Sequence, residues 1–225
     1  MKKFVICIGV PRTATSFLYQ LFRDCSDFSY TPVKETNFFL STNSETIEEY
    51  LKHFEIRSDN FFECSPAYFS SQDALKRISF TLSEPEIIFC TRDIKQRFIS
   101  QYKHHIKTIS KYFSSFEDYC ENATTFSNDW FHPNYNYRAS NYKRIYQDLL
   151  GIFPLDKIHH LSHDDLVSNK ESWIMKIEEI AKCSFEGWDK KSKTNQSKDI
   201  KDDLIIPSKL AKVLENHQDE FLDFV

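Results

Sequence analysis

The sequence predicts an α/β protein with a central parallel sheet flanked by helices. Short apolar runs typical of buried strands alternate along the chain with longer stretches that carry apolar residues at helical spacing. Strands that are apolar throughout, without a polar alternate face, indicate a parallel sheet covered on both sides. The 225 residues are 40% hydrophobic, which suffices for one domain with a substantial core. We therefore expect a single domain over residues 1–225.

The strands and helices follow one another in a regular order. Three apolar runs predict strands clearly, and a fourth run is a weaker candidate. The strands are expected at Phe4–Ile8, Phe61–Cys64, Glu86–Thr91 and, as the weaker candidate, Lys157–Ser162. Apolar residues at helical spacing predict the elements between and after them. These helices are expected around Thr15–Phe22, Ile47–Phe54, Leu75–Leu82, Lys95–Tyr112, Tyr142–Phe153, Lys170–Cys183 and Ser208–Phe221.

Charge and cysteine usage exclude several classes of protein. With 29 basic and 33 acidic residues, the net charge is -4, so the chain as a whole does not attract nucleic acid or an anionic membrane, and any anion site is local. The 6 cysteines form no C-x-x-C pair and no Cys/His cluster at metal spacing, which favours a reducing compartment. No apolar run reaches the roughly 20 residues that a membrane-spanning helix needs. We expect a cytoplasmic protein without a metal site.

The first predicted strand leads into a tight loop and a helix start, in the stretch GVPRTATSFL. One of only 3 glycines in the chain, Gly9, opens this loop. Unpaired N–H groups and the positive dipole end of a helix start attract an anion. Arg12 adds a fixed positive charge, and Thr13, Thr15 and Ser16 add hydroxyl donors. The stretch therefore predicts a phosphate-binding loop of the P-loop type.

Two other interpretations of this loop stay open. In one, the loop is a plain turn in which Thr13 or Thr15 caps the helix. In the other, the loop belongs to a nucleotide kinase or NTPase. The glycine and lysine that a triphosphate site requires are replaced here by Ala14 and Thr15, and this disfavours the kinase interpretation.

Several stretches, in the same order along the chain, resemble the sulfotransferases that use 3′-phosphoadenosine 5′-phosphosulfate (PAPS). GVPRTATSFL is similar to the family's loop for the 5′-phosphosulfate. KETNFF and FFECSPAYF resemble segments of the glycan-type and bacterial members. EIIFCTRDIKQRFISQY is similar to the 3′-phosphate-binding segment, and YQDLLGIFPLDKIHHLSHDDL to a later helix, strand and acidic-Asp-Leu step. The resemblance covers residues 4 to about 166.

The resemblance implies a three-layer, P-loop NTPase-like sandwich and a reaction without a metal. The enzyme would transfer a sulfuryl group from PAPS to a hydroxyl or amine of a carbohydrate, lipid or small molecule. Glu35 takes the family's acidic position and would act as general base, with Lys34 beside it to position the sulfate. The residues implied to hold the 5′-phosphosulfate are Arg12, Thr13, Ala14, Thr15 and Ser16, with Arg12 also acting on the reacting sulfate.

The same resemblance implies a second anion site for the 3′-phosphate. Arg92 follows a predicted strand, at the edge where open α/β sheets bind ligands, and Ser100 lies two helical turns further on. In the tail, Ser197 and Lys198 resemble part of a loop that covers the donor. That loop lies in the polar stretch 189–203, which reads either as a solvated loop before the last helix or as a basic flap over an anionic ligand.

Each of these assignments has an alternative in which the residues have a structural role only. The alternative for Lys34 and Glu35 is an exposed ion pair on a loop. The alternative for Arg92 is a local salt bridge with Asp93, with Ser100 facing solvent, and the coincidence of two anion-binding stretches favours the functional interpretation. Where the glycan-type pattern has lysine, this chain has Cys64, and Thr13 and Ala14 stand in place of loop glycines. These departures leave the acceptor class open. They also leave open the alternative that the protein binds a nucleotide without catalysing a reaction.

Overall fold

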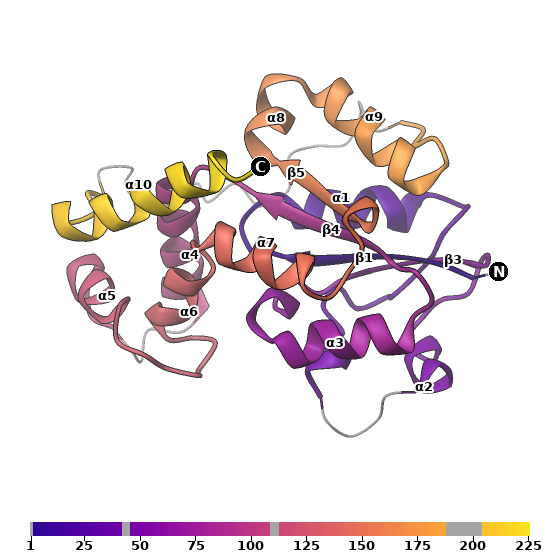
Figure 1. Ribbon diagram of the computed structural model, residues 1–225, viewed down its shortest axis with the longest axis horizontal. Coiled ribbons are helices and arrows are strands. Elements are labelled where there is room, and N and C mark those ends of the chain that lie inside the picture. The colour runs from indigo at the N-terminus through magenta and orange to yellow at the C-terminus, as the bar shows by residue number, and fades with distance from the viewer. Residues whose placement is uncertain (1, 42–45, 109–112, 188–203) are drawn as a thin grey trace. The chain divides into compact units, whose positions relative to one another are not determined.

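The computed structural model describes residues 2–41, 46–108, 113–187 and 204–225. The described chain forms two compact units, one from residues 1–91 and 147–194, the other from residues 92–146 and 195–225. The first unit contains the sheet, and the second is helical (Figure 1). The expectation of one domain stays a prediction.

The first unit is built on a parallel five-stranded sheet with the order β2-β3-β1-β4-β5. The four predicted strands are confirmed, with ends that differ by one residue or less. A fifth strand was not predicted because its two residues are too few to form a pattern. The strands are β1 (Lys3–Gly9), β2 (Ser29–Tyr30), β3 (Asn60–Cys64), β4 (Glu86–Thr91) and β5 (Ile158–Ser162).

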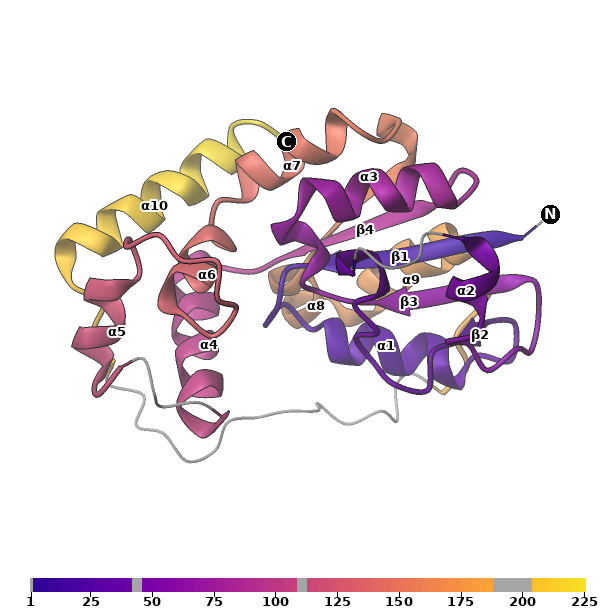
Figure 2. The ribbon, with the colours of Figure 1, turned by 90° about the horizontal axis from the view of Figure 1, so that it is seen from below.

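Helices cover both faces of this sheet, which confirms the predicted three-layer architecture (Figure 2). Side chains alternate between the faces along each strand. One face packs on α1 (Thr15–Asp24) and α9 (Lys170–Ala181), where the ring of Phe22 stacks on that of Phe62 with centroids 3.9 Å apart. The other face packs against the segment around α2 (Ile47–Leu51) and α3 (Gln72–Thr81), where Phe4 contacts Tyr50.

The remaining helices are short or belong to the second unit. Each of the three helices that the sequence did not predict has at most seven residues, too few to show a periodic pattern. Two helices of the second unit, α4 and α10, were predicted, and α7 runs from the second unit into the first. The bounds are α4 (Ile94–Thr108), α5 (Phe116–Asn122), α6 (Pro133–Arg138), α7 (Tyr142–Leu150), α8 (His163–Ser168) and α10 (Ser208–Leu222), with single 3-10 turns at Phe38–Leu40, Tyr68–Ser70 and Leu155–Lys157.

The helices of the described residues are all unlike membrane-spanning helices. None of the helices there combines the length and the apolar character that crossing a bilayer requires.

Candidate active site

The loop after β1 depends on a glycine. Gly9 has a φ of +119°, and a Cβ atom built on it would lie 2.3 Å from the backbone oxygen of Pro66. The N–H group of Val10 then donates to the carbonyl of Cys90 (3.1 Å), and the Thr13 hydroxyl donates to the Val10 carbonyl (2.7 Å). These contacts hold the loop against β3 and β4, and only glycine satisfies them.

The helix after the loop begins without a side-chain cap. Its N-cap residue is Ala14, which makes no capping hydrogen bond, so the interpretation in which Thr13 or Thr15 caps the helix is wrong. Four backbone N–H groups at this helix start have no hydrogen-bond acceptor among the described residues, those of Thr13, Ala14, Thr15 and Ser16. These four donors and the positive dipole end of the helix form a site suited to an anion.

Left-handed backbone conformations gather around this loop. Arg12 and Ala14 have φ values of 71° and 69°, and Glu35 and Asn37 have 69° and 53°. Within the described chain, these four belong to a set of six non-glycine residues with positive φ. Such conformations cost about 1–3 kcal/mol each and cluster at functional sites, where the surroundings enforce them. Left-handed residues therefore occur both in the loop after β1 and in the turn that holds Glu35.

Lys34 and Glu35 lie beside the loop. The Glu35 N–H group donates to the carbonyl of Cys64 (3.1 Å), and the Cys64 thiol donates to the carbonyl of Thr15 (3.7 Å). Cys64 therefore links the Glu35 turn to the first residue of α1. The Lys34 ammonium contacts a Glu35 carboxylate oxygen at 2.5 Å, so the two residues form the ion pair that the alternative interpretation predicts. This pair lies at the edge of the loop after β1, which we call the anion loop.

The electrostatics of the pair favour a charged lysine. Burial lowers the pKa of Lys34, but the neighbouring Glu35 carboxylate raises it, and the pKa ends above its ordinary value. The Lys34 side chain is 20% exposed and that of Glu35 46% exposed, so the carboxylate stays open to a ligand. Cys64 itself is fully buried, and burial raises the pKa of its thiol. It supplies no charge, and Lys34 is the cation at this position.

A buried glutamate supports the Glu35 loop and was not predicted from the sequence. Glu63 precedes Cys64 and is fully buried. Its carboxylate accepts hydrogen bonds from Thr36 (3.0 Å), Tyr50 (3.4 Å) and Ser65, and the Ser65 hydroxyl in turn accepts from the N–H group of Asn37 (3.0 Å). The network fixes the two residues that follow Glu35. An acidic residue inside the apolar run FFECSP was the sequence signal for it.

The pKa of Glu63 makes the stability of this network depend on pH. Burial raises this pKa from 4.5 to about 7, against hydrogen bonds from Ser65 and Thr36 that lower it. The folded protein keeps the Glu63 proton to higher pH than the unfolded chain does. The protonated carboxyl group therefore contributes its full stabilisation below about pH 4.5, and this stabilisation is lost as the pH rises through 7. The loss amounts to about 3 kcal/mol at 1.36 kcal/mol per pKa unit.

We expect Glu63→Gln to remove this part of the pH dependence. Urea unfolding of the wild type and the variant, at a pH below 4.5 and at a pH above 7, measures this dependence. From the lower to the higher pH, the unfolding free energy of the variant should rise by about 3 kcal/mol relative to that of the wild type. An equal difference between the two proteins at both pH values would contradict the assignment of a neutral, buried Glu63.

Arg92 and Ser100 belong to the second unit. Arg92 directly follows β4, and its backbone is held by Tyr142, whose hydroxyl donates to the Arg92 carbonyl (2.8 Å). The Arg92 guanidinium donates to the Gln96 side chain (3.3 Å), while Asp93 accepts from the Gln96 N–H group (2.8 Å) at the start of α4. Ser100 is half-buried on the same helix. Arg92 therefore precedes α4 and Ser100 lies within that helix, and their binding of a 3′-phosphate stays a prediction.

Arg97, also on α4, is a second residue that the sequence did not point out. It is fully buried, and its Nη2 donates to the carbonyl of Asn136 (2.6 Å), to that residue's Oδ1 (2.7 Å) and to the hydroxyl of Ser140 (2.6 Å). Burial lowers its pKa. These bonds anchor the helix that carries Ser100 to α6, so Arg97 positions Ser100. An arginine within the otherwise regular helix pattern gave no indication of this.

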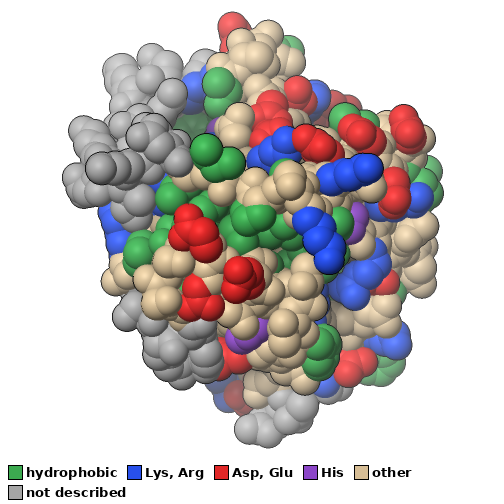
Figure 3. All heavy atoms as spheres, turned by 90° about the vertical axis from the view of Figure 1, so that its left-hand side faces the viewer, with side chains coloured by type: hydrophobic (Ala, Val, Ile, Leu, Met, Phe, Trp, Pro, Cys, Tyr) green, Lys and Arg blue, Asp and Glu red, His purple; other side chains and the backbone are tan. Residues whose placement is uncertain are grey.

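The surface of the second unit carries charges of both signs. Figure 3, which views the side where α10 and α5 lie in Figure 1, shows basic and acidic side chains interspersed on that face. Two further predicted residues, Ser197 and Lys198, lie outside the described residues, as does the polar stretch 189–203.

Two solved sulfotransferase structures resemble this chain in fold. A sulfotransferase from Alicyclobacillus acidocaldarius superposes with a TM-score of 0.73 at 14% identity, over 96% of this chain and 91% of that one. The sulfotransferase domain from the curacin biosynthetic pathway gives 0.59 at 9% identity, over 97% of this chain and 98% of that one. At such identities the likeness shows the fold, and it confirms the predicted sandwich.

Sequence comparisons point to the same family. The membrane-associated sulfotransferase kil1 of Dictyostelium discoideum is 28% identical over 111 residues, and the match spans 47% of this chain but only 24% of that relative. The family described as the sulfotransferase domain matches residues 2–214. Because this match extends over nearly the whole sequence, the chain belongs to the sulfotransferase domain family.

Proposed function

We propose that the protein transfers a sulfuryl group from PAPS to a hydroxyl or amine of a carbohydrate, lipid or small molecule. The observation that carries the proposal is the loop after β1, where four backbone N–H groups have no hydrogen-bond acceptor among the described residues and lie beside Arg12 and next to the Lys34–Glu35 pair. Membership in the sulfotransferase domain family supports sulfate as the transferred group, and disfavours the kinase interpretation.

The residues of the first unit suit the reacting end of the donor. The loop N–H groups and Arg12 would bind the 5′-phosphosulfate, and the Lys34 ammonium would hold the sulfate oxygens. As the acceptor oxygen or nitrogen bonds to sulfur, the bond from sulfur to the phosphate oxygen breaks, and adenosine 3′,5′-bisphosphate leaves. Glu35 would take the acceptor's proton, since its half-exposed carboxylate is open to a ligand.

The second unit would bind the 3′-phosphate. A guanidinium grips a phosphate through two hydrogen bonds, and a hydroxyl one turn or two further along a helix adds a third. Arg92 and Ser100 have these groups, and Arg97 holds their helix in place. Ser197 and Lys198 remain candidates for a segment that covers the donor.

We expect Arg92→Ala to weaken the binding of adenosine 3′,5′-bisphosphate about 10–100-fold, because hydrogen bonds to charged groups contribute about 1.5–3 kcal/mol. Isothermal titration calorimetry measures the change. Lys95→Ala is the matched control, since it removes a positive charge three residues after Arg92, at the start of α4, and the Lys95 ammonium pairs with Glu215. Equal affinities for the wild type and Arg92→Ala would remove Arg92 from the site.

Transfer of ³⁵S from labelled PAPS into a panel of carbohydrates, lipids and small hydroxyl or amine compounds tests the activity itself. Label in any acceptor supports the proposal and names the acceptor class. Tight binding of adenosine 3′,5′-bisphosphate without transfer to any member of the panel would favour the non-catalytic alternative that Cys64 raised. The cytoplasmic location expected from the sequence stays a prediction.

A further inference from the structure

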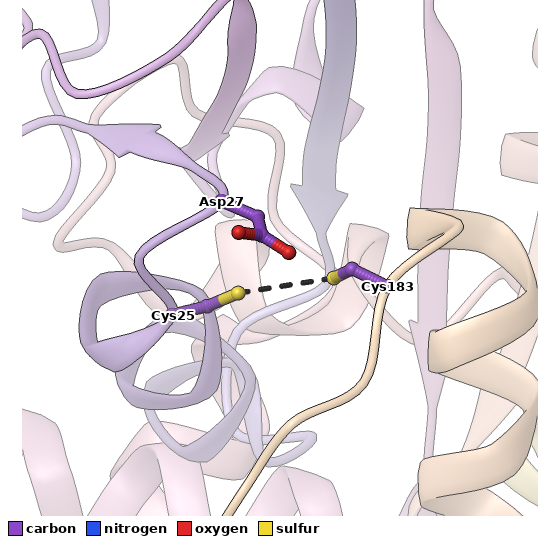
Figure 4. Close-up of side chains that lie close together, drawn as sticks. All are labelled: Cys25, Asp27 and Cys183. Carbon is purple, nitrogen blue, oxygen red and sulfur yellow. Dashed lines mark hydrogen bonds between the residues drawn. The ribbon is translucent and has the colours of Figure 1, made fainter.

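Two cysteines and an aspartate come together at the far end of α1 from the anion loop. Cys25 directly follows α1, Asp27 lies two residues later, and Cys183 lies two residues after α9. The two sulfur atoms are 3.8 Å apart, and one oxygen of Asp27 completes a set of three atoms that all lie within 4.8 Å of one another. Figure 4 shows the carboxylate of Asp27 directed toward the two sulfur atoms.

Hydrogen bonds fix the backbone that presents these side chains. The carbonyl of Asp27 accepts from the hydroxyl of Ser58 (2.6 Å) and the side-chain amide of Asn60 (3.0 Å). Beside Cys183, the Lys182 N–H group donates to the carbonyl of Glu178 (2.8 Å). The ammonium of Lys3 holds the end of α9 through the carbonyls of Ile180 and Ala181, at 2.8 and 2.7 Å. The ligands thus come from rigid segments, as a metal site requires.

We propose that Cys25, Asp27 and Cys183 bind a thiophilic divalent cation of the zinc type, with water as the fourth ligand. Two thiolates bound to one zinc ion at about 2.3 Å and the tetrahedral angle lie about 3.8 Å apart, which is the separation of the two sulfur atoms here. Zinc accepts a carboxylate oxygen together with sulfur, and Asp27 is exposed, so rotation of its side chain brings the oxygen into position.

The third donor separates this site from a simple cysteine pair. A disulfide requires sulfur atoms about 2.05 Å apart and has no use for a carboxylate. A carboxylate next to two thiols opposes their ionisation unless a cation is present. Binding of the cation therefore replaces the two thiol protons: both sulfur atoms bind as thiolates, and two protons are released to solvent.

The cation would join the ends of two helices that are distant in the sequence. Cys25 and Cys183 are 158 residues apart, so a bond through the metal closes a long loop and stabilises the first unit. The site is separated from the anion loop by the ten residues of α1, about 15 Å at 1.5 Å per residue. Its role is structural, and it does not depend on the proposed transfer reaction.

Titration of the reduced, metal-free full chain with Cd²⁺ tests the site through the thiolate-to-cadmium absorbance in the ultraviolet. We expect saturation at one equivalent per chain with release of two protons, competition by Zn²⁺, and a higher unfolding temperature with Zn²⁺. Cys183→Ser should abolish the signal. Asp27→Asn, at an exposed position, should weaken binding at least by the roughly 10-fold that loss of an outer-shell partner costs.

Cys120→Ser is the matched control, because Cys120 is a buried cysteine of the second unit, and it should keep the signal. The proposal is overturned if the wild type shows no saturable signal, or if Cys183→Ser and Asp27→Asn bind Cd²⁺ as the wild type does. It is also overturned if mass spectrometry of protein prepared without oxidant shows Cys25 and Cys183 joined as a disulfide.

Discussion

Replacement of Glu35 by glutamine is expected to lower the rate of sulfuryl transfer by about 10²–10⁴-fold, the usual contribution of a general base. Glutamine keeps the size of the side chain but cannot accept the acceptor's proton. The measurement is ³⁵S transfer from labelled PAPS at saturating donor and acceptor. Because Glu35 does not touch the bisphosphate in our account, the affinity for adenosine 3′,5′-bisphosphate should stay unchanged.

Glu84→Gln is the matched control for this variant. Glu84 is an exposed glutamate of the same unit that also has a positive φ, of 46°, so the exchange makes the same chemical change on a similar backbone. It should transfer sulfate at the wild-type rate. If Glu35→Gln turned over as fast as the wild type, Glu35 would not be the base, and a loss shared by both variants would point to a nonspecific effect.

Gly9→Ala is expected to destabilise the folded protein by about 3 kcal/mol or more, because overlap with backbone atoms has no flexible partner that can move away. The added methyl group would lie 2.3 Å from the Pro66 oxygen, at a φ of +119° that side chains rarely adopt. Urea unfolding followed by circular dichroism measures the free energy of unfolding. Failure of the variant to fold is the limiting form of the same result.

Gly187→Ala separates the two causes. Gly187 also has a positive φ, of +68°, but a Cβ atom there meets nothing within 4 Å. It should therefore lose only the conformational term, about 1 kcal/mol. If Gly9→Ala were as stable as Gly187→Ala, the close approach of the loop to Pro66 would not be required for folding.

The longer elements could be predicted because their patterns are dense. The strand Glu86–Thr91 and the starts of the helices at Thr15 and Tyr142 agree with the structure, since a buried strand and an amphipathic helix each repeat their signal several times. The two-residue strand at Ser29–Tyr30 and the helix at Pro133–Arg138 could not be predicted, because their formation depends on tertiary pairing and on a single capping residue.

The candidate site was predictable only in part, for a physical reason. Motifs pointed to Arg12, Glu35 and Arg92, because each residue lies within a local stretch that resembles a family motif. Glu63 and Arg97 support their neighbours through contacts with residues 27 and 39 positions away. The acidic residue within FFECSP marked the position of Glu63, but no local pattern shows which distant residues these two side chains contact. The pairing of Cys25 with Cys183 is the extreme case, since spacing in the sequence showed no metal pattern.

Titration of the purified protein with adenosine 3′,5′-bisphosphate, and separately with ATP and Mg²⁺, tests most directly whether the loop after β1 belongs to a PAPS site. We predict saturable binding of the bisphosphate at one equivalent, weakened in Arg92→Ala. ATP should bind far more weakly, because the loop has Ala14 and Thr15 where a triphosphate site has glycine and lysine. Tight binding of ATP with none of the bisphosphate would contradict it.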